Sequence, residues 1–180
     1  MQGDILVALG ANMQTVEGGP ADTLKAALAA MPGFGIKVAR VAPFYRTVAL
    51  SAYIQPDYVN SVAVIEAVLP PGELLEMLHR IEAMFGRVRG ERWAPRTLDL
   101  DLLDYRGVVV PPRGNRGGDS GAGPLPLALP HPGIAARAFV LWPLRDVAPH
   151  WRHPVTGLSV DRLIGALGAE AAQGIERISD

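Results

Sequence analysis

The sequence predicts an α+β fold in which one antiparallel sheet packs against helices as a ferredoxin-like, split βαβ sandwich. Apolar runs rich in β-branched residues alternate with helix-forming segments, in the order strand, helix, strand, strand, helix, strand, which is the order of that fold. A length of 180 residues suits one domain with its own core and is short for two. We therefore expect a single domain over residues 1–180.

The first half of the chain contains three predicted strands and one predicted helix. Ile5–Leu9 is a short apolar run that ends at a glycine, as expected for a buried strand. Pro20–Met31 is rich in helix formers and stops at a Pro-Gly pair, which predicts a helix. Residues 36–47 and 58–68 are rich in β-branched and aromatic residues and predict two strands.

The second half opens with a helix. Pro70-Pro71-Gly72 begins it, and an apolar stripe at helical spacing extends it to about Phe85. A strand is predicted over residues 97–105, with Val108–Val110 pairing against it across the turn at Arg106-Gly107.

The remaining chain differs in composition from what precedes it. Residues 111–128 are too rich in glycine and proline to form a core and predict a surface loop. Phe139–Leu144 is an apolar run that we expect to be buried, and a last helix is predicted around residues 160–167.

Composition excludes several classes of protein. The formal net charge is −1, so no overall field attracts nucleic acid or an acidic membrane, and no apolar run is long enough for a membrane span. The absence of cysteine excludes disulfides and thiolate chemistry, and is compatible with a reducing compartment. The first residues lack the basic region of a signal peptide. We expect a cytoplasmic protein that binds neither nucleic acid nor membrane.

Two aspartates on one predicted strand are the first candidate site residues. Side chains alternate along a strand, so Asp99 and Asp101 share one face, roughly 7 Å apart, while the leucines between them face the core. Two carboxylates at this spacing suit Mg²⁺, which prefers oxygen ligands. Alternation alone also produces such pairs on ordinary solvated strands, so the pair needs further support.

That support comes from four arginines immediately upstream. Arg87, Arg89, Arg92 and Arg96 lie in a segment interrupted by glycine and proline, as expected for a loop. Guanidinium groups bind phosphate oxygens with two hydrogen bonds, so a loop of arginines beside a metal site indicates a polyphosphate substrate. A basic, tryptophan-containing patch for RNA is the competing interpretation. The two carboxylates argue against it, because they repel a phosphate backbone unless a cation lies between them.

Eight ordered segments of the chain match the sequence pattern of one enzyme family. The most specific segment runs from Glu91 to Asp101 and contains Arg-Trp-Ala-Pro-Arg-Thr-Leu-Asp-Leu-Asp. The others are residues 9–12, 44–47, 55–60, 80–82, 86–89, 129–131 and 137–144. With these segments the chain resembles the hydroxymethyldihydropterin pyrophosphokinase family of folate biosynthesis, whose enzymes transfer the β,γ-pyrophosphate of ATP to the hydroxymethyl group of a reduced pterin and release AMP.

The resemblance implies a role for each matching residue. Asp99 and Asp101 would bind two Mg²⁺ ions, and Arg87 and Arg96 would stabilise charge on the transferred group. The residues implied for ATP are Leu75, His79, Glu82, Arg89, Arg92, Leu102, His131 and Arg137. Those implied for the pterin are Thr47, Leu50, Tyr58, Asn60, Trp93 and Phe139. The resemblance also implies a monomer whose partners are these two small molecules.

Two other classes remain open on the residues alone. Another two-metal, ATP-dependent transferase, such as a nucleotidyltransferase, could use the same pair of aspartates. A non-catalytic ferredoxin-like module could use the arginine-tryptophan segment to bind RNA. The products formed from ATP separate the first from a pyrophosphokinase, and magnesium-independent RNA binding would identify the second.

Overall fold

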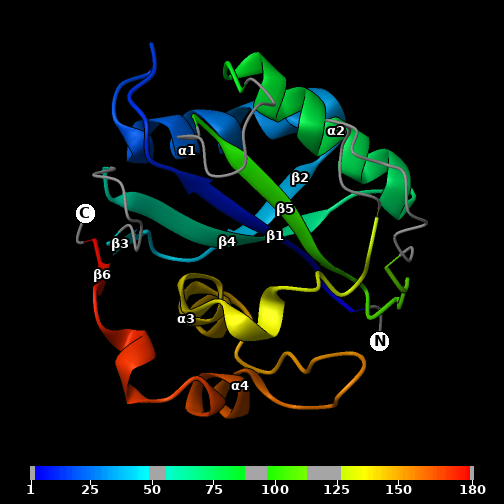
Figure 1. The fold of residues 1–180 in the computed structure, drawn as a ribbon. Coiled ribbons are helices and arrows are strands. Elements are labelled where there is room, and N and C mark those ends of the chain that lie inside the picture. The colour runs from blue at the N-terminus through cyan, green and yellow to red at the C-terminus, as the bar shows by residue number, and fades with distance from the viewer. Residues whose placement is uncertain (1–2, 49–55, 88–96, 113–126, 179–180) are drawn as a thin grey trace, which may run out of the picture.

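The computed structural model describes residues 3–48, 56–87, 97–112 and 127–178. These residues form one layer of strands between two layers of helices (Figure 1). The sheet is antiparallel in every pair of strands, which confirms the predicted α+β class. No helix in the described ranges has the length and apolar character needed to cross a membrane.

Strand β1 (Ile5–Ala11) lies at the centre of the sheet and is buried along its whole length. It pairs with β4 (Tyr58–Glu66) on one side and with β5 (Asp99–Tyr105) on the other. The order across the sheet is β5-β1-β4-β3-β6, with β2 also paired to β4. Strand β5 therefore lies at one edge, and its outward-facing backbone groups need other partners.

The predicted strand over residues 36–47 is two strands, β2 (Lys37–Val41) and β3 (Tyr45–Thr47). Pro43 lies between them and has no N–H to contribute to a ladder. The break is held by Ser61, whose hydroxyl donates to the carbonyl of Ala42 at 2.9 Å. A third short strand, β6 (Ile175–Arg177), pairs with β3 and was not predicted.

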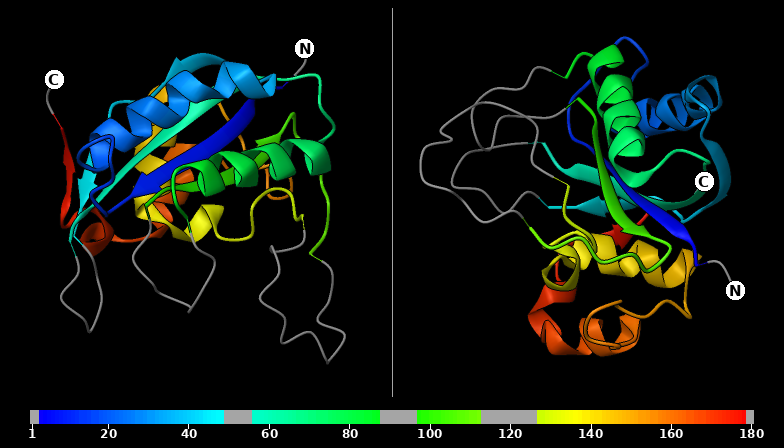
Figure 2. Two further views of the ribbon diagram at one scale, coloured as in Figure 1. Left: turned by 90° about the horizontal axis from the view of Figure 1, so that it is seen from above. Right: turned by 90° about the vertical axis from the view of Figure 1, so that its right-hand side faces the viewer.

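Helices α1 (Pro20–Ala30) and α2 (Pro71–Met84) cover one face of the sheet, as expected (Figure 2). Both begin with proline in the first turn, where a missing N–H costs no hydrogen bond. The buried stripe on α2 consists of Leu74, Leu78 and Ile81, all fully buried. They pack on the β1 and β5 residues that face this side, and this packing forms the larger apolar core.

The opposite face is covered by α3 (Ala138–Val147) and α4 (Val160–Ala166), which add a layer to the predicted two-layer sandwich. The run 139–144 is thus helical and mostly buried, but Phe139 is 36% exposed, so its predicted burial was wrong. Two hydrogen bonds fix this layer to the sheet. Tyr45 Oη donates to Asp146 at 2.6 Å, and Trp151 Nε1 donates to Asp104 at 2.7 Å.

The predicted pairing of Val108–Val110 against β5 was wrong. Arg106 and Gly107 do form a tight turn with positive φ angles of 54° and 76°. Beyond the turn, however, Val110 bridges to Leu129 and makes no ladder with β5. The Gly/Pro-rich loop predicted at 111–128 falls mostly at residues 113–126, outside the described residues.

Candidate active site

The first half of β5 places Asp99 and Asp101 on the face that α3 covers, while its leucines face α2. Leu98, Leu100 and Leu102 belong to the core beneath α1 and α2, as the alternation predicted. The aspartate side chains remain 21% and 33% exposed. A register shift farther along β5 adds one residue to the strand opposite Leu6 and Val7. The two carboxylates lie before this shift, so they share one face.

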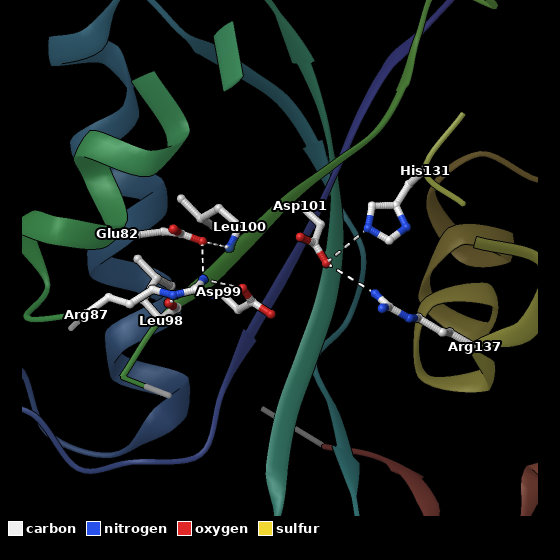
Figure 3. Close-up of polar contacts among 8 residues, drawn as sticks. All are labelled: Glu82, Arg87, Leu98, Asp99, Leu100, Asp101, His131 and Arg137. Carbon is white, nitrogen blue, oxygen red and sulfur yellow. Dashed lines mark hydrogen bonds and ion pairs between the residues drawn. The ribbon is translucent and has the colours of Figure 1, made fainter. Parts of the chain in front are cut away.

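Arg87 joins Asp99 to a buried glutamate of α2 (Figure 3). Its Nη1 donates to Asp99 Oδ1 and to Glu82 Oε1. Glu82 is only 2% exposed, and its Oε1 also accepts the backbone N–H of Leu100 at 2.7 Å. Glu82 thereby satisfies an outward N–H of the edge strand and holds the guanidinium next to Asp99. Its position in this structure is that of a residue that orients Arg87.

Asp101 contacts two cationic or ionisable side chains from the segment that leads into α3. Arg137 Nη1 lies 3.3 Å from Asp101 Oδ2, and His131 Nε2 lies 3.8 Å from the same oxygen (Figure 3). The backbone N–H of Gly133 donates to His131 Nδ1 at 3.0 Å, so the ring presents Nε2 to Asp101. Burial lowers the pKa of His131, and the attraction of Asp101 opposes that shift.

Asn60 lies on the same face as the carboxylates, two strands away. Gly10 of β1 is the direct partner of Asp99 on β5 and of Asn60 on β4, so the three residues form one row across the sheet. The Asn60 side chain donates through Nδ2 to Thr47 Oγ1 at 2.7 Å. Because this bond occupies the amide nitrogen, the amide oxygen is left toward β1.

These residues surround a hollow of about 270 Å³ that opens to solvent between the sheet and α3. We call it the carboxylate hollow. Its lining residues are Ala8, Leu9, Gly10, Asn60, Ser61, Asp99, Asp101, Phe139 and Val140. The half-exposed ring of Phe139 forms one wall, with the Arg137 guanidinium 6.0 Å from its centre. An aromatic ring, an amide and two carboxylates can bind a flat, polar heterocycle next to a cation-bound phosphate.

A second hollow lies at the C-terminal end of α2. It encloses about 820 Å³ of space open to solvent and is lined by Gln14, Thr15, Val16, Glu17, Met84, Phe85, Gly86 and Thr97. Although it is larger, Glu17 is the single ionisable residue among the described residues that line it. The described lining therefore offers no pair of acids for a metal-bound phosphate, and the carboxylate hollow is the better candidate site.

The donor set of the carboxylate hollow fits Mg²⁺ better than a transition metal. Within the described ranges, no three or more His, Cys, Asp or Glu side chains are grouped so that they could hold a metal. Mg²⁺ keeps several water ligands and is commonly held by one or two carboxylates together with substrate phosphates. Two aspartates that remain partly exposed meet that requirement.

The structure brings most of the described candidates together. Thr47, Asn60, Glu82, Arg87, Asp99, Asp101, His131, Arg137 and Phe139 all lie in or beside the carboxylate hollow. Tyr58 lies at the start of β4, paired with Thr47. Leu102 is buried in the core under α2, Leu75 packs against that core, and His79 lies on α2. These three line neither hollow, so their implied contacts with ATP remain predictions. Leu50, Arg89, Arg92, Trp93 and Arg96 lie outside the described residues.

Sequence reasoning from the acids and arginines missed the floor of the hollow. Ala8 and Gly10 of β1 and Ser61 of β4 line it without carrying an obvious chemical signature. One signal was present, because a glycine in the interior of a strand often marks a close approach. The residues that approach this glycine are set by the register of the strands, which the local amino-acid sequence does not show.

Comparison with known proteins identifies the family of this chain. Residues 6–149 match the family described as 7,8-dihydro-6-hydroxymethylpterin-pyrophosphokinase (HPPK). Two relatives named 2-amino-4-hydroxy-6-hydroxymethyldihydropteridine pyrophosphokinase are each 38% identical over 176 residues. The one from Synechocystis sp. is matched over 95% of this chain and 82% of its own length, and the one from Pseudomonas aeruginosa over 97% and 96%.

A solved structure supports the fold independently of sequence. The crystal structure of Plasmodium falciparum HPPK-DHPS aligns with a TM-score of 0.71 at 13% identity. The alignment covers 98% of this chain and 47% of that longer one, so this chain spans about half of it. The matched family segment includes β1 apart from its first residue, every strand from β2 to β5, and both aspartates. The chain belongs to the 7,8-dihydro-6-hydroxymethylpterin-pyrophosphokinase family.

Proposed function

We propose that this protein transfers the β,γ-pyrophosphate of ATP to the hydroxymethyl group of 6-hydroxymethyl-7,8-dihydropterin and releases AMP. One observation carries the proposal beyond family membership. The carboxylate hollow joins two acids suited to Mg²⁺ with an amide and an aromatic ring suited to a pterin. The two substrates therefore have adjoining places on the same face of the sheet.

Asp99 and Asp101 are the proposed ligands of two Mg²⁺ ions. When bound, the ions neutralise charge on the phosphate oxygens and on the attacking and leaving oxygens. The two carboxylates have different neighbours in the structure. Asp99 is paired with Arg87, and Asp101 faces Arg137 and His131. Because Arg87 is shared between Glu82 and Asp99, three carboxylates face two arginines among the described residues, and this excess of acids favours a cation.

The arginines bind and orient the phosphates. Arg87 is fixed by Glu82 at the end of α2, so its guanidinium is positioned before the substrate arrives. Arg137 stands on the other side of Asp101, at the start of α3. The sequence places Arg89, Arg92 and Arg96 in the same neighbourhood, and we assign them to the triphosphate on that ground alone.

The pterin end of the site is polar at the sheet and aromatic at α3. Asn60 offers an amide oxygen to ring N–H groups, because its nitrogen is engaged by Thr47. Phe139 covers the hollow from the opposite side, since its ring is partly exposed there. Tyr58 is adjacent to Thr47 across the β3–β4 pair and completes the described part of this assignment.

The reaction needs no protein nucleophile. The hydroxymethyl oxygen forms a bond to the β-phosphorus, and the bond from that phosphorus to the oxygen it shares with the α-phosphorus breaks. AMP leaves with this oxygen, and the hydroxyl proton is lost. Positioning and stabilisation of charge carry the rate in such a transfer. We further propose that the protein acts as a monomer in the cytoplasm.

The products formed from ATP test the proposal. Purified protein with magnesium, ATP and the hydroxymethyl pterin should form AMP and the pterin diphosphate in equal amounts. Formation of ADP would identify an ordinary kinase and overturn the pyrophosphoryl transfer. Asp101→Asn should abolish both products, while Asp161→Asn, an exposed acid in the first turn of α4, is the matched control and should form both at the normal rate.

A further inference from the structure

Glycine is an unusual residue in the interior of a strand, where Gly10 lies. It lies inside the central strand β1, where glycine weakens a strand by its backbone entropy and its missing side chain. Its φ angle is not positive, unlike those of Gly18, Gly35 and Gly86, so the backbone does not require glycine. The register shift between β1 and β5 lies at Leu6 and Val7 and leaves Gly10 in regular pairing.

The space above Gly10 explains the choice. A Cβ at this position would lie 2.9 Å from Asn60 Oδ1, closer than such carbons approach other atoms. Asn60 is only 6% exposed and is held from the other side by Thr47, so its amide has little freedom to withdraw. A side chain at residue 10 must therefore displace the Asn60 amide or break its bond to Thr47.

Gly10 also sets the depth of the carboxylate hollow. On the face toward α3, β1 presents Ala8 beside Asp101 and Gly10 beside Asp99, so the two smallest residues lie next to the acids. Any larger group at Gly10 would stand in the row between Asp99 and Asn60, which the proposed metal-bound phosphate and pterin approach from opposite ends.

We propose that Gly10 is a positioning residue of the pterin site, which it shapes by leaving room for the Asn60 amide. The inference rests on the proposed function, because it takes the pterin as the occupant of the hollow. Gly10 acts through Asn60, and it contributes no chemical group of its own.

Gly10→Ala tests this inference. We expect the KM for the pterin to rise at least about tenfold, the scale of one extra methyl group in a tight site. The KM for ATP should stay within about twofold. The melting temperature should fall only slightly, because the lower entropy of the unfolded chain partly offsets the disturbed bond between Asn60 and Thr47. Gly33→Ala is the control, since that glycine has no positive φ and nothing within 4 Å of an added Cβ.

A double-mutant cycle with Asn60→Ala then tests the route of the effect. With the amide removed, adding Gly10→Ala should change the pterin KM by less than about twofold, and the double variant should remain folded. If Gly10→Ala still raises the pterin KM about tenfold in the Asn60→Ala background, the inference is overturned. It is also overturned if the double variant does not fold. Both outcomes count even if the single variant Gly10→Ala is itself unfolded. Unchanged pterin KM in the single variant also overturns it, while AMP formation by the wild type keeps the proposed function. A wild type that neither binds nor converts the pterin overturns both.

Discussion

Along β1 and β5, the face of the sheet toward α1 and α2 is apolar from end to end, whereas the face toward α3 and α4 is apolar over only part of its length. On the first face, alternate residues of β1 and β5 pack against the stripe of α2 without interruption. On the second, Leu6, Val64 and Leu103 pack against α3, but the row containing Gly10, Asn60 and Asp99 does not. The first face therefore contributes mainly to stability. The second face also provides a binding site, because the polar row interrupts its packing.

The same strands supply both faces, so the packing of the core and the orientation of the site residues both depend on the alternation of side chains along each strand. Asp99 and Asp101 face the site because Leu98, Leu100 and Leu102 face the core. A shift of one residue in β5 would exchange the acids and the leucines, so the register that buries the core also orients the carboxylates. Variants that change one face and leave the other intact should therefore separate the loss of activity from the loss of stability.

The largest effect is expected at the acids of the binding face. Asp99→Asn and Asp101→Asn keep the size of the side chain and remove the charge that binds the cation. We expect kcat/KM to fall on the order of 10³-fold in each, the scale of losing one essential charge-stabilising group. The melting temperature should change little, because both side chains are partly exposed. Near-normal turnover in either variant would contradict the assignment of the metal site.

A cavity in the apolar face should give the opposite result. Leu78 of α2 is fully buried, so Leu78→Ala should lower the free energy of unfolding by about 2–5 kcal/mol. Below the melting temperature, kcat should remain within about twofold of normal, because the residue lies on the far side of the sheet from the hollow. Val68→Ala, at a 96% exposed position, is the control for stability. Denaturant unfolding and steady-state kinetics on the same samples measure both effects.

The smallest effect is expected where α3 is fixed to the sheet. Burial and the hydrogen bond to Asp146 raise the pKa of Tyr45 to about 12. The unfolded chain has the ordinary value of about 10, so the folded state keeps the proton longer. The resulting stability is complete below pH 10 and is lost as the pH rises toward 12.

Tyr45→Phe removes this contribution. Below pH 10 the variant should be less stable than the wild type by about 1 kcal/mol, the usual net value of one hydrogen bond. The difference should shrink between pH 10 and pH 12, as measured by denaturant unfolding across that range. A difference that stays constant with pH would show that the raised pKa of Tyr45 does not contribute to stability.

The elements that could be predicted from the sequence are those whose signal is local. The period of two in β5 and the stripe of α2 gave both elements to within a few residues and placed the two aspartates on one face. Strand β6 could not be predicted, because three residues carry no period and its pairing with β3 spans most of the chain. Phe139–Leu144 was apolar enough to predict burial, but a short apolar run does not distinguish a helix from a strand.

The paired aspartates and the adjacent arginines of the site were predicted from the residues themselves, Asn60 and Phe139 were named only through the family resemblance, and the small residues Gly10 and Ala8 were missed. Carboxylates and arginines point to their chemistry from any position in a sequence. Gly10 and Ala8 matter because of which side chains stand beside them, and that is set by pairing with β4 and β5. The contact between Glu82 and the Leu100 N–H is likewise visible only once α2 lies against the edge strand.

We propose that the pterin binds in the carboxylate hollow and not in the hollow at the end of α2. Backbone amide chemical shifts test this most directly. The measurement adds the hydroxymethyl pterin to ¹⁵N-labelled protein that already contains magnesium and α,β-methylene ATP, whose α–β bridge cannot be cleaved. We predict that the largest changes occur at residues lining the carboxylate hollow, including Gly10, Asn60 and Phe139. Largest changes at Val16, Glu17 and Gly86, with Gly10 and Asn60 unmoved, would place the pterin in the hollow at the end of α2 and contradict the account.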